Sequence, residues 1–190
     1  MHYSGSARVK LMLFGVAALV SIFLWIATAW LVNPWFNFYT GALSALGSLG
    51  ATDPWIYNVG LMFTSILIVF YSAGLILYSR NTIQTVGSSF FIVAAMFLAL
   101  IGIYHGGTYP HDFVSSWFFV QADIAILIWG IGATIKKRLI GVYSLVIAVS
   151  ASLFAYAVNW PSSAELETFG TCAISLWVIL TIAFALKNKL

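Results

Sequence analysis

Three polar residues share one face of a single apolar segment and are the best candidates for chemistry in this chain. Asp112, Ser116 and Asp123 are spaced by four and seven residues, and this spacing places their side chains on one face of an α-helix. Asp123 lies roughly 16 Å from the outer rim of that helix, where a charged residue costs about 2.5–3.5 kcal/mol. We expect it either to hydrogen-bond to a neighbouring helix, which would fix packing, or to bind a proton or substrate in an outward-open cavity.

A second set of polar residues lies at the outer ends of the apolar segments. His105, His111 and Asp112 lie in one short connection, Asp53 lies at the end of another, and Asn58 lies near the start of the segment that follows it. Imidazole and carboxylate groups are zinc ligands, but their spacing matches no known ligand pattern, and the glycines and proline around them predict a turn. We therefore expect no metal and no other cofactor, with His105, His111 and Asp112 as the weak metal candidates. As the residue before an apolar segment, Asp112 also suits a helix N-cap.

Sequence signatures of several enzyme classes are absent. The chain has no G-x-S-x-G, no H-E-x-x-H, no G-x-x-x-x-G-K-[ST] and no C-x-x-C. Its one cysteine, Cys172, lies inside an apolar run and reads as a packing residue. The sequence therefore favours a protein without catalytic activity, and the catalytic residues, if any, are not identified.

The elements that must position these residues are membrane-spanning helices. The chain of 190 residues is 62% hydrophobic and 7% charged, whereas a soluble domain carries about 25% charged residues. Runs long enough to cross a bilayer as helices predict a single all-α transmembrane domain over 1–190, with about six spans near 10–32, 54–78, 87–104, 113–134, 139–159 and 169–186.

Charge predicts the orientation of the spans. The eight basic residues lie in the two termini and in the connections around 80 and 136–138, while the other three connections carry only acidic residues. Positive residues mark the cytoplasmic side, so we expect a multi-pass plasma-membrane protein with both termini in the cytoplasm. Nucleic acid is not an expected partner, because no basic stripe carries stacking aromatics. Glu165 and Glu167 read as solvated loop charges.

The connection over residues 33–53 is the longest in the chain. Leu43, Leu46 and Leu49 recur every three residues among small residues, which predicts a short helix at the outer interface or dipping back into the bundle. Asp53 and Pro54 then read as the N-cap and first residue of the second helix.

Aromatic side chains are concentrated at the outer ends of the predicted helices. Trp35, Trp55, Tyr109 and Trp117 are the prominent members. An interfacial belt that anchors the protein in the bilayer explains them, and a floor for a bound lipid or a partner protein is the functional alternative.

Three short motifs carry a resemblance to a known family. They are Ser48-Leu49-Gly50, Asn58-Val59-Gly60-Leu61, and His111 with Phe118-Phe119. In these motifs and in helix order the chain resembles the prokaryotic family of small membrane proteins called domain of unknown function 998. Ser48 departs from the acidic residue of that family's first motif. The layout is also distantly similar to the Frag/DRAM/Sfk membrane proteins, some of which are linked to lipid remodelling.

Three functions remain open from the sequence. The first is an accessory membrane protein that binds a lipid or a partner subunit through its aromatic outer face. The second is a small proton-coupled transporter that uses Asp123, although no inverted repeat is evident. The third is a hydrolase at the outer face built on His105, His111, Asp112 and Asp53.

Overall fold

The structure, a computed structural model, describes residues 5–187 and contains no strand over that range. The order of elements is α1 (Gly5–Leu31), the 3-10 helix η1 (Leu43–Gly47), α2 (Trp55–Tyr78), α3 (Thr82–Ile103), α4 (His111–Ile135), α5 (Leu139–Ala157) and α6 (Ser163–Lys187). All six α-helices are long and apolar enough to cross a membrane. This confirms the predicted all-α transmembrane architecture.

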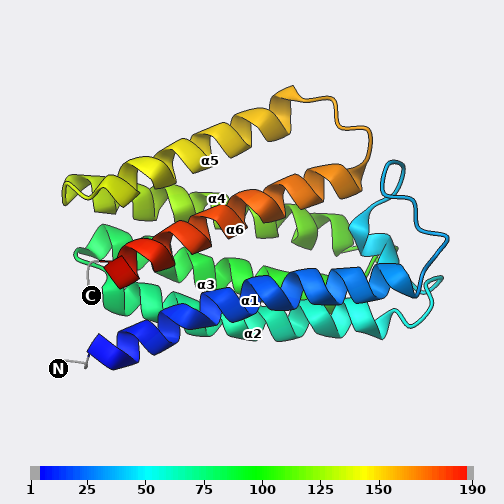
Figure 1. The fold of residues 1–190 in the computed structure, drawn as a ribbon. Helices are drawn as coiled ribbons and strands as arrows, with labels where there is room; N and C mark the ends of the chain where they lie inside the picture. Colours follow the sequence, from blue (N-terminus) through cyan, green and yellow to red (C-terminus); the bar gives the residue numbers. More distant parts are fainter. Residues whose placement is uncertain (1–4, 188–190) are drawn as a thin grey trace.

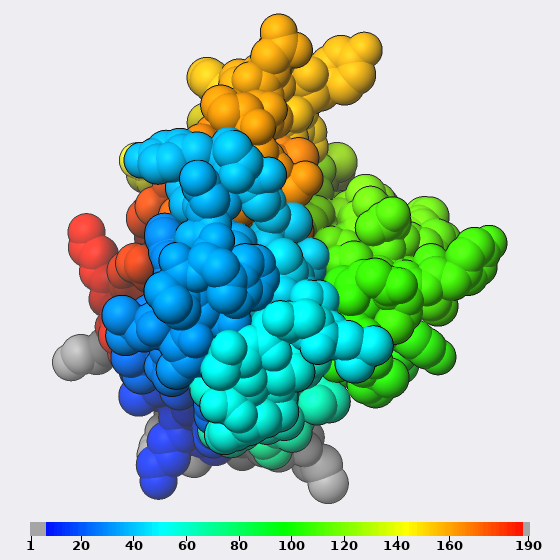
Figure 2. Space-filling view, turned by 90° about the vertical axis from the view of Figure 1, so that its right-hand side faces the viewer, coloured from blue at the N-terminus to red at the C-terminus, as the bar shows by residue number. Residues whose placement is uncertain are grey.

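The helices run alongside one another, so their connections lie at two ends (Figure 1). The α1–α2, α3–α4 and α5–α6 connections form what we call the loop end. Both chain termini and the α2–α3 and α4–α5 connections form the terminal end. Figure 2 views the loop end, where the α5–α6 connection projects beyond the rest of the molecule.

Several helices begin earlier than their apolar runs predict, the first of them at Gly5. The third begins at Thr82 and the sixth at Ser163, because polar residues form capped first turns there. Asn81 accepts a hydrogen bond from the backbone N–H of Gln84, and Ser162 Oγ accepts one from the N–H of Glu165. Such caps satisfy free N–H groups at a helix start, so a helix can extend into polar sequence.

The two predicted aspartate caps are wrong. The residue before α2 is Pro54 and the residue before α4 is Pro110, and neither helix has a side-chain cap. Asp53 has a positive φ of 48°, whereas an N-cap is usually extended, and its carboxylate accepts from Trp55 Nε1. Asp112 lies within the first turn of α4, where the helix dipole favours a negative charge.

The long connection after α1 packs onto the helices and also has an exposed part. Of its three spaced leucines, Leu43 and Leu46 are buried, whereas Leu49 is 86% exposed. Asn33 holds the far part of the connection, since its side chain donates to the carbonyl of Thr52 and accepts from the Thr52 N–H. The predicted short helix is therefore present, as a single 3-10 turn seated on the bundle.

Helix α5 separates from α6 halfway along its length. Its buried residues are Ile140, Gly141, Ser144 and Ala148, all in the half nearer the terminal end, where Trp177 Nε1 of α6 donates to Ser144 Oγ. Towards the loop end α5 diverges from α6 (Figure 1). This divergence opens the space described next.

Candidate functional site

The space between α4, α5 and α6 is a groove of about 740 Å³. Its floor is α4, and its two walls come from α5 and from the first half of α6. Most of the wall is apolar, including Ala151, Ala155, Leu166, Phe169 and Ala173. Because all three helices are membrane spans, the groove lies at the depth of the bilayer.

The polar face expected on the fourth helix runs along the floor of this groove. Asp112, Ser116 and Asp123 all line it. Asp112 and Ser116 are exposed, and Asp123 is half-buried further from the loop end. The polar face formed by these three residues therefore borders the groove between α4, α5 and α6.

Asp123 is hydrogen-bonded to the neighbouring helix. Its Oδ2 atom accepts a 2.8 Å bond from Ser152 Oγ of α5, and both residues line the groove. This contact is of the interhelical kind that the sequence led us to expect. The same contact also leaves the carboxylate at the wall of a cavity, so the packing role and the binding role are compatible.

Glu167 is the site residue that the sequence interpretation missed. The expectation of a solvated loop charge is wrong, because Glu167 lies inside α6 and its Oε2 accepts a 2.7 Å hydrogen bond from the backbone N–H of Leu43. One signal was available in the sequence. Glu167, Thr171 and Ser175 follow one another at intervals of four and line one face of α6, where each hydroxyl donates to the carbonyl four residues before it.

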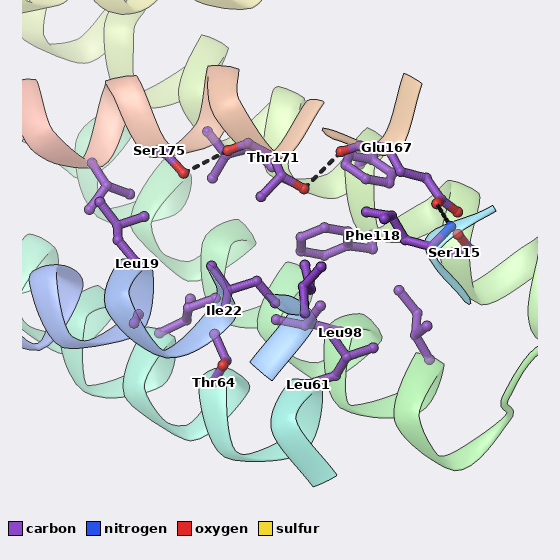
Figure 3. A pocket seen from close by; sticks show the side chains of 18 of the residues that line it. Leu19, Ile22, Leu61, Thr64, Leu98, Ser115, Phe118, Glu167, Thr171 and Ser175 are labelled. Carbon is purple, nitrogen blue, oxygen red and sulfur yellow. Dashed lines mark hydrogen bonds between the residues drawn. The ribbon is translucent and has the colours of Figure 1, made fainter. Parts of the chain in front are cut away.

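A second, smaller cavity of about 70 Å³ lies inside the bundle, among α1, α2, α3, α4 and α6. Figure 3 shows Glu167, Ser115 and Phe118 at one end of it, with Leu19 and Ser175 further along. Five residues line this inner cavity and the groove alike, namely Ser44, Ser115, Phe119, Glu167 and Ile174. These residues therefore form the partition between the two spaces.

The polar cluster expected at the outer face does not converge on one point. Asn58 Nδ2 donates to the carbonyl of Gly47, His105 Nδ1 donates to the carbonyl of Gly106, and Asp53 is exposed beside Trp55. His111 is buried and lines the groove, where its Nδ1 donates to the carbonyl of Tyr104. Over residues 5–187 no group of three His, Cys, Asp or Glu side chains is placed to hold a metal ion.

The four prominent aromatics lie on different elements. Trp35 contacts Phe36, and Trp117 contacts Phe97 and Phe113. Trp35, Trp55, Tyr109 and Trp117 are all exposed. Their positions are those of separate anchors around the loop end, which suits a belt better than a single binding floor.

The residues that carry the family resemblance have structural roles near this site. Asn58 ties α2 to η1 through Gly47. Phe118 and Phe119 form an edge-on ring pair with centroids 4.8 Å apart, and Phe119 is part of the partition between the two cavities. Ser48 Oγ donates to the carbonyl of Ala45 and closes η1.

Comparison with known proteins gives one match. The family described as "Protein of unknown function (DUF998)" matches residues 16–183, which include all six membrane spans in whole or in large part. No curated protein and no solved structure matches the chain.

Proposed function

We propose that this chain, which belongs to the DUF998 family of proteins of unknown function, binds a lipid-like amphiphile in the groove between α4, α5 and α6. The observation that carries this proposal is the groove itself. Its volume of about 740 Å³ falls in the range of about 300–1,000 Å³ typical of small-molecule sites.

The walls of the groove suit a hydrocarbon chain. Apolar side chains of α5 and α6 face each other across it, from Ala155 and Leu166 near the loop end to Ile147 and Ile174 deeper in. Acyl and isoprenoid chains are the apolar molecules present at this depth of the membrane. Burial of its methylene groups would supply the free energy of binding, at about 0.8 kcal/mol for each buried CH₂.

The polar floor suits a head group that donates hydrogen bonds. Asp112, Asp123 and Glu167 line the groove, and no Lys or Arg does. Carboxyl oxygens accept hydrogen bonds, so a head group that donates them, such as an amine or a hydroxyl, complements these side chains. We propose an amphiphile with an amine or hydroxyl head.

Native mass spectrometry of the protein released gently from its own membrane tests this proposal. A retained amphiphile with an amine or hydroxyl head is the expected result. A bare chain, or a chain that retains only a second polypeptide, would contradict it. In the latter case the protein would act as an accessory subunit.

Proton-coupled transport is the second candidate, and one contact favours it. Asp123 lines the groove, and its carboxylate on α4 is hydrogen-bonded to Ser152 on α5. Gain or loss of a proton at this carboxylate would therefore alter the contact between the two helices. A pH-dependent flux through reconstituted vesicles that Asp123→Asn abolishes would support transport. Unchanged flux in that variant would exclude it.

The orientation is also proposed. The seven basic residues within 5–187 lie in or beside the segments that form the terminal end, and the positive-inside rule predicts that this end faces the cytoplasm. The loop end, with the mouth of the groove, would then face outward from the plasma membrane.

A further inference from the structure

The terminal end of the bundle holds an unusual set of buried polar atoms that have no hydrogen-bond partner. Over residues 5–187 there are seven such side-chain atoms, and five of them belong to Arg8, Tyr78, Gln84, Trp129 and Arg138. Buried polar groups are hydrogen-bonded in nearly all native structures, and an exception signals a water or an ion that binds there.

Three of these side chains are in direct contact. The guanidinium carbon of Arg138 lies 4.2 Å from the centroid of the Tyr78 ring. The Tyr78 ring in turn stacks on Trp129, with centroids 6.5 Å apart. The Tyr78 hydroxyl, Trp129 Nε1 and Arg138 Nη1 are the unpartnered atoms of the three. Each of these contacting side chains, near the ends of α2 and α4 and at the start of α5, therefore carries one unpartnered atom.

Gln84 joins this group from α3. Its side chain is fully buried and packs against Gly132, which lies about one turn beyond Trp129 on α4. The oxygen of the Gln84 amide accepts from the N–H of Arg80, so the free atom is the donor Nε2.

Arg8 of α1 lies at the level of this group. Gly74 of α2 packs against Met12 of α1, and the two helices run in opposite directions (Figure 1). One turn nearer the terminal end, Arg8 of α1 and Tyr78 of α2 therefore lie at the same level of the bundle. Arg8 and Arg138 are each half-buried, so the group can be reached from outside the bundle.

The group consists of donors and has no acidic partner. Arginine and tryptophan side chains have no acceptor atom. All five Asp and Glu residues of the chain lie elsewhere, at positions 53, 112, 123, 165 and 167. Burial lowers the pKa of Arg138, but arginine remains charged in proteins, so a positive charge stays beside these donors without a counter-charge.

We propose that these side chains bind a phosphate group, supplied either by the head of an anionic phospholipid or by free phosphate. A phosphate offers several acceptor oxygens, which donors from four helices and from the α4–α5 connection can share. The planar guanidinium of Arg138 matches its geometry. The group lies where the spans end, which is the level of lipid head groups. This site is independent of the groove, which opens toward the other end of the molecule.

Thermal unfolding of the purified full chain in a neutral detergent tests the proposal. The probes are dihexanoyl phosphatidic acid, inorganic phosphate, and sodium chloride at matched ionic strength. A ligand that binds only the folded protein raises Tm. We expect Tm to rise with the short-chain lipid or with phosphate and to stay unchanged with chloride. A rise with phosphate alone identifies free phosphate as sufficient, and a rise with the lipid alone identifies the head group as the source.

Two variants and a control make the test specific. Arg138→Gln should weaken binding about tenfold or more, because it removes a charged hydrogen-bond donor. Tyr78→Phe keeps the ring and removes only the hydroxyl, and it should weaken phosphate binding several-fold. This variant provides the test if Arg138→Gln fails to fold. Lys136→Gln removes an equal charge from an exposed neighbour and should bind as the unmodified chain does.

Two results would overturn the proposal. One is no rise of Tm with either phosphate-bearing probe. The other is equal weakening in Lys136→Gln and Arg138→Gln, which would mean that only the overall positive charge of this end attracts anions.

Discussion

The carboxylate of Glu167 accepts a 2.7 Å hydrogen bond from the backbone N–H of Leu43, although the two residues are 124 positions apart in the sequence. Leu43 begins η1 and Glu167 lies in the second turn of α6. A second bond reinforces the contact, because Ser162 Oγ donates to the carbonyl of Phe38 at 2.7 Å. The long first connection is thus held on the start of α6, beside the partition between the groove and the inner cavity.

Removing that carboxylate should destabilise the protein. Glu167→Ala leaves the N–H of Leu43 without its partner, at a cost of about 1–3 kcal/mol, which would appear as a lower Tm in detergent. Glu167→Gln keeps an acceptor oxygen and should lose less. Glu165→Ala, two residues away in the same helix, is the control and should change Tm little. Equal losses in the two alanine variants would refute the role of the Leu43 contact.

Gly170 should tolerate no side chain, because the ring of Phe119 lies against it. A Cβ at this position would come within 2.7 Å of Phe119 Cε1, so Gly170→Ala must displace the ring that separates the two cavities. Overpacking of this kind costs about 1–3 kcal/mol. Gly50→Ala, where a Cβ would meet nothing within 4 Å, serves as the comparison in the same thermal unfolding assay. A Gly170→Ala protein as stable as the Gly50→Ala protein would show that Phe119 moves freely.

A bulky residue in the groove should expel the proposed amphiphile. Ala151 lines the groove on α5, and Ala151→Phe would fill part of its volume. Val146→Phe on the same helix changes an exposed residue outside the groove and should retain the ligand. Native mass spectrometry of the two variants measures the bound fraction, and the prediction fails if they retain the same amount.

The Asp123–Ser152 bond should contribute measurably to the attachment of α5. Ser152→Ala removes the donor to the Asp123 carboxylate and should cost about 0.5–1.5 kcal/mol. Ser150→Ala makes the same chemical change two residues away, where the hydroxyl donates only within its own helix, to the Ile147 carbonyl. If chemical denaturation gives the same free energy of unfolding for both variants, the interhelical bond is of no consequence for stability.

Cysteine labelling in intact cells tests the orientation. Tyr109 and Lys136 are exposed at opposite ends of the bundle, and the free thiol of Cys172 is first removed by Cys172→Ala. An impermeant maleimide should label Tyr109→Cys in intact cells and Lys136→Cys only after permeabilisation. The reverse pattern would place the termini outside and contradict the orientation proposed from charge.

Local pattern was sufficient for the helices and for the polar stripe. The spans follow from runs of apolar residues, which in a bilayer must satisfy their backbone groups internally. Asp112, Ser116 and Asp123 face one way because the spacing along a helix is regular. The sequence also indicated a hydrogen bond from a neighbouring helix to Asp123, although it could not identify Ser152 as the donor.

Helix starts were less predictable, because several residues near a start are chemically suited to it. Asp53 and Asp112 are good N-cap types, yet prolines occupy the position before both helices. Thr82 and Ser163 begin their helices in polar sequence that hydropathy alone assigns to loops.

The amino-acid sequence by itself determined six spans, their polar face and the separation of charge between the two ends, because hydropathy, helical period and charge are properties of neighbouring residues. The tertiary structure alone decided where that polar face opens. The groove exists because α5 leaves α6 beyond Ala148, and Glu167 belongs to the site because a backbone N–H far away in the chain meets its carboxylate. Contacts of this kind depend on how whole helices pack, and no local spacing encodes them.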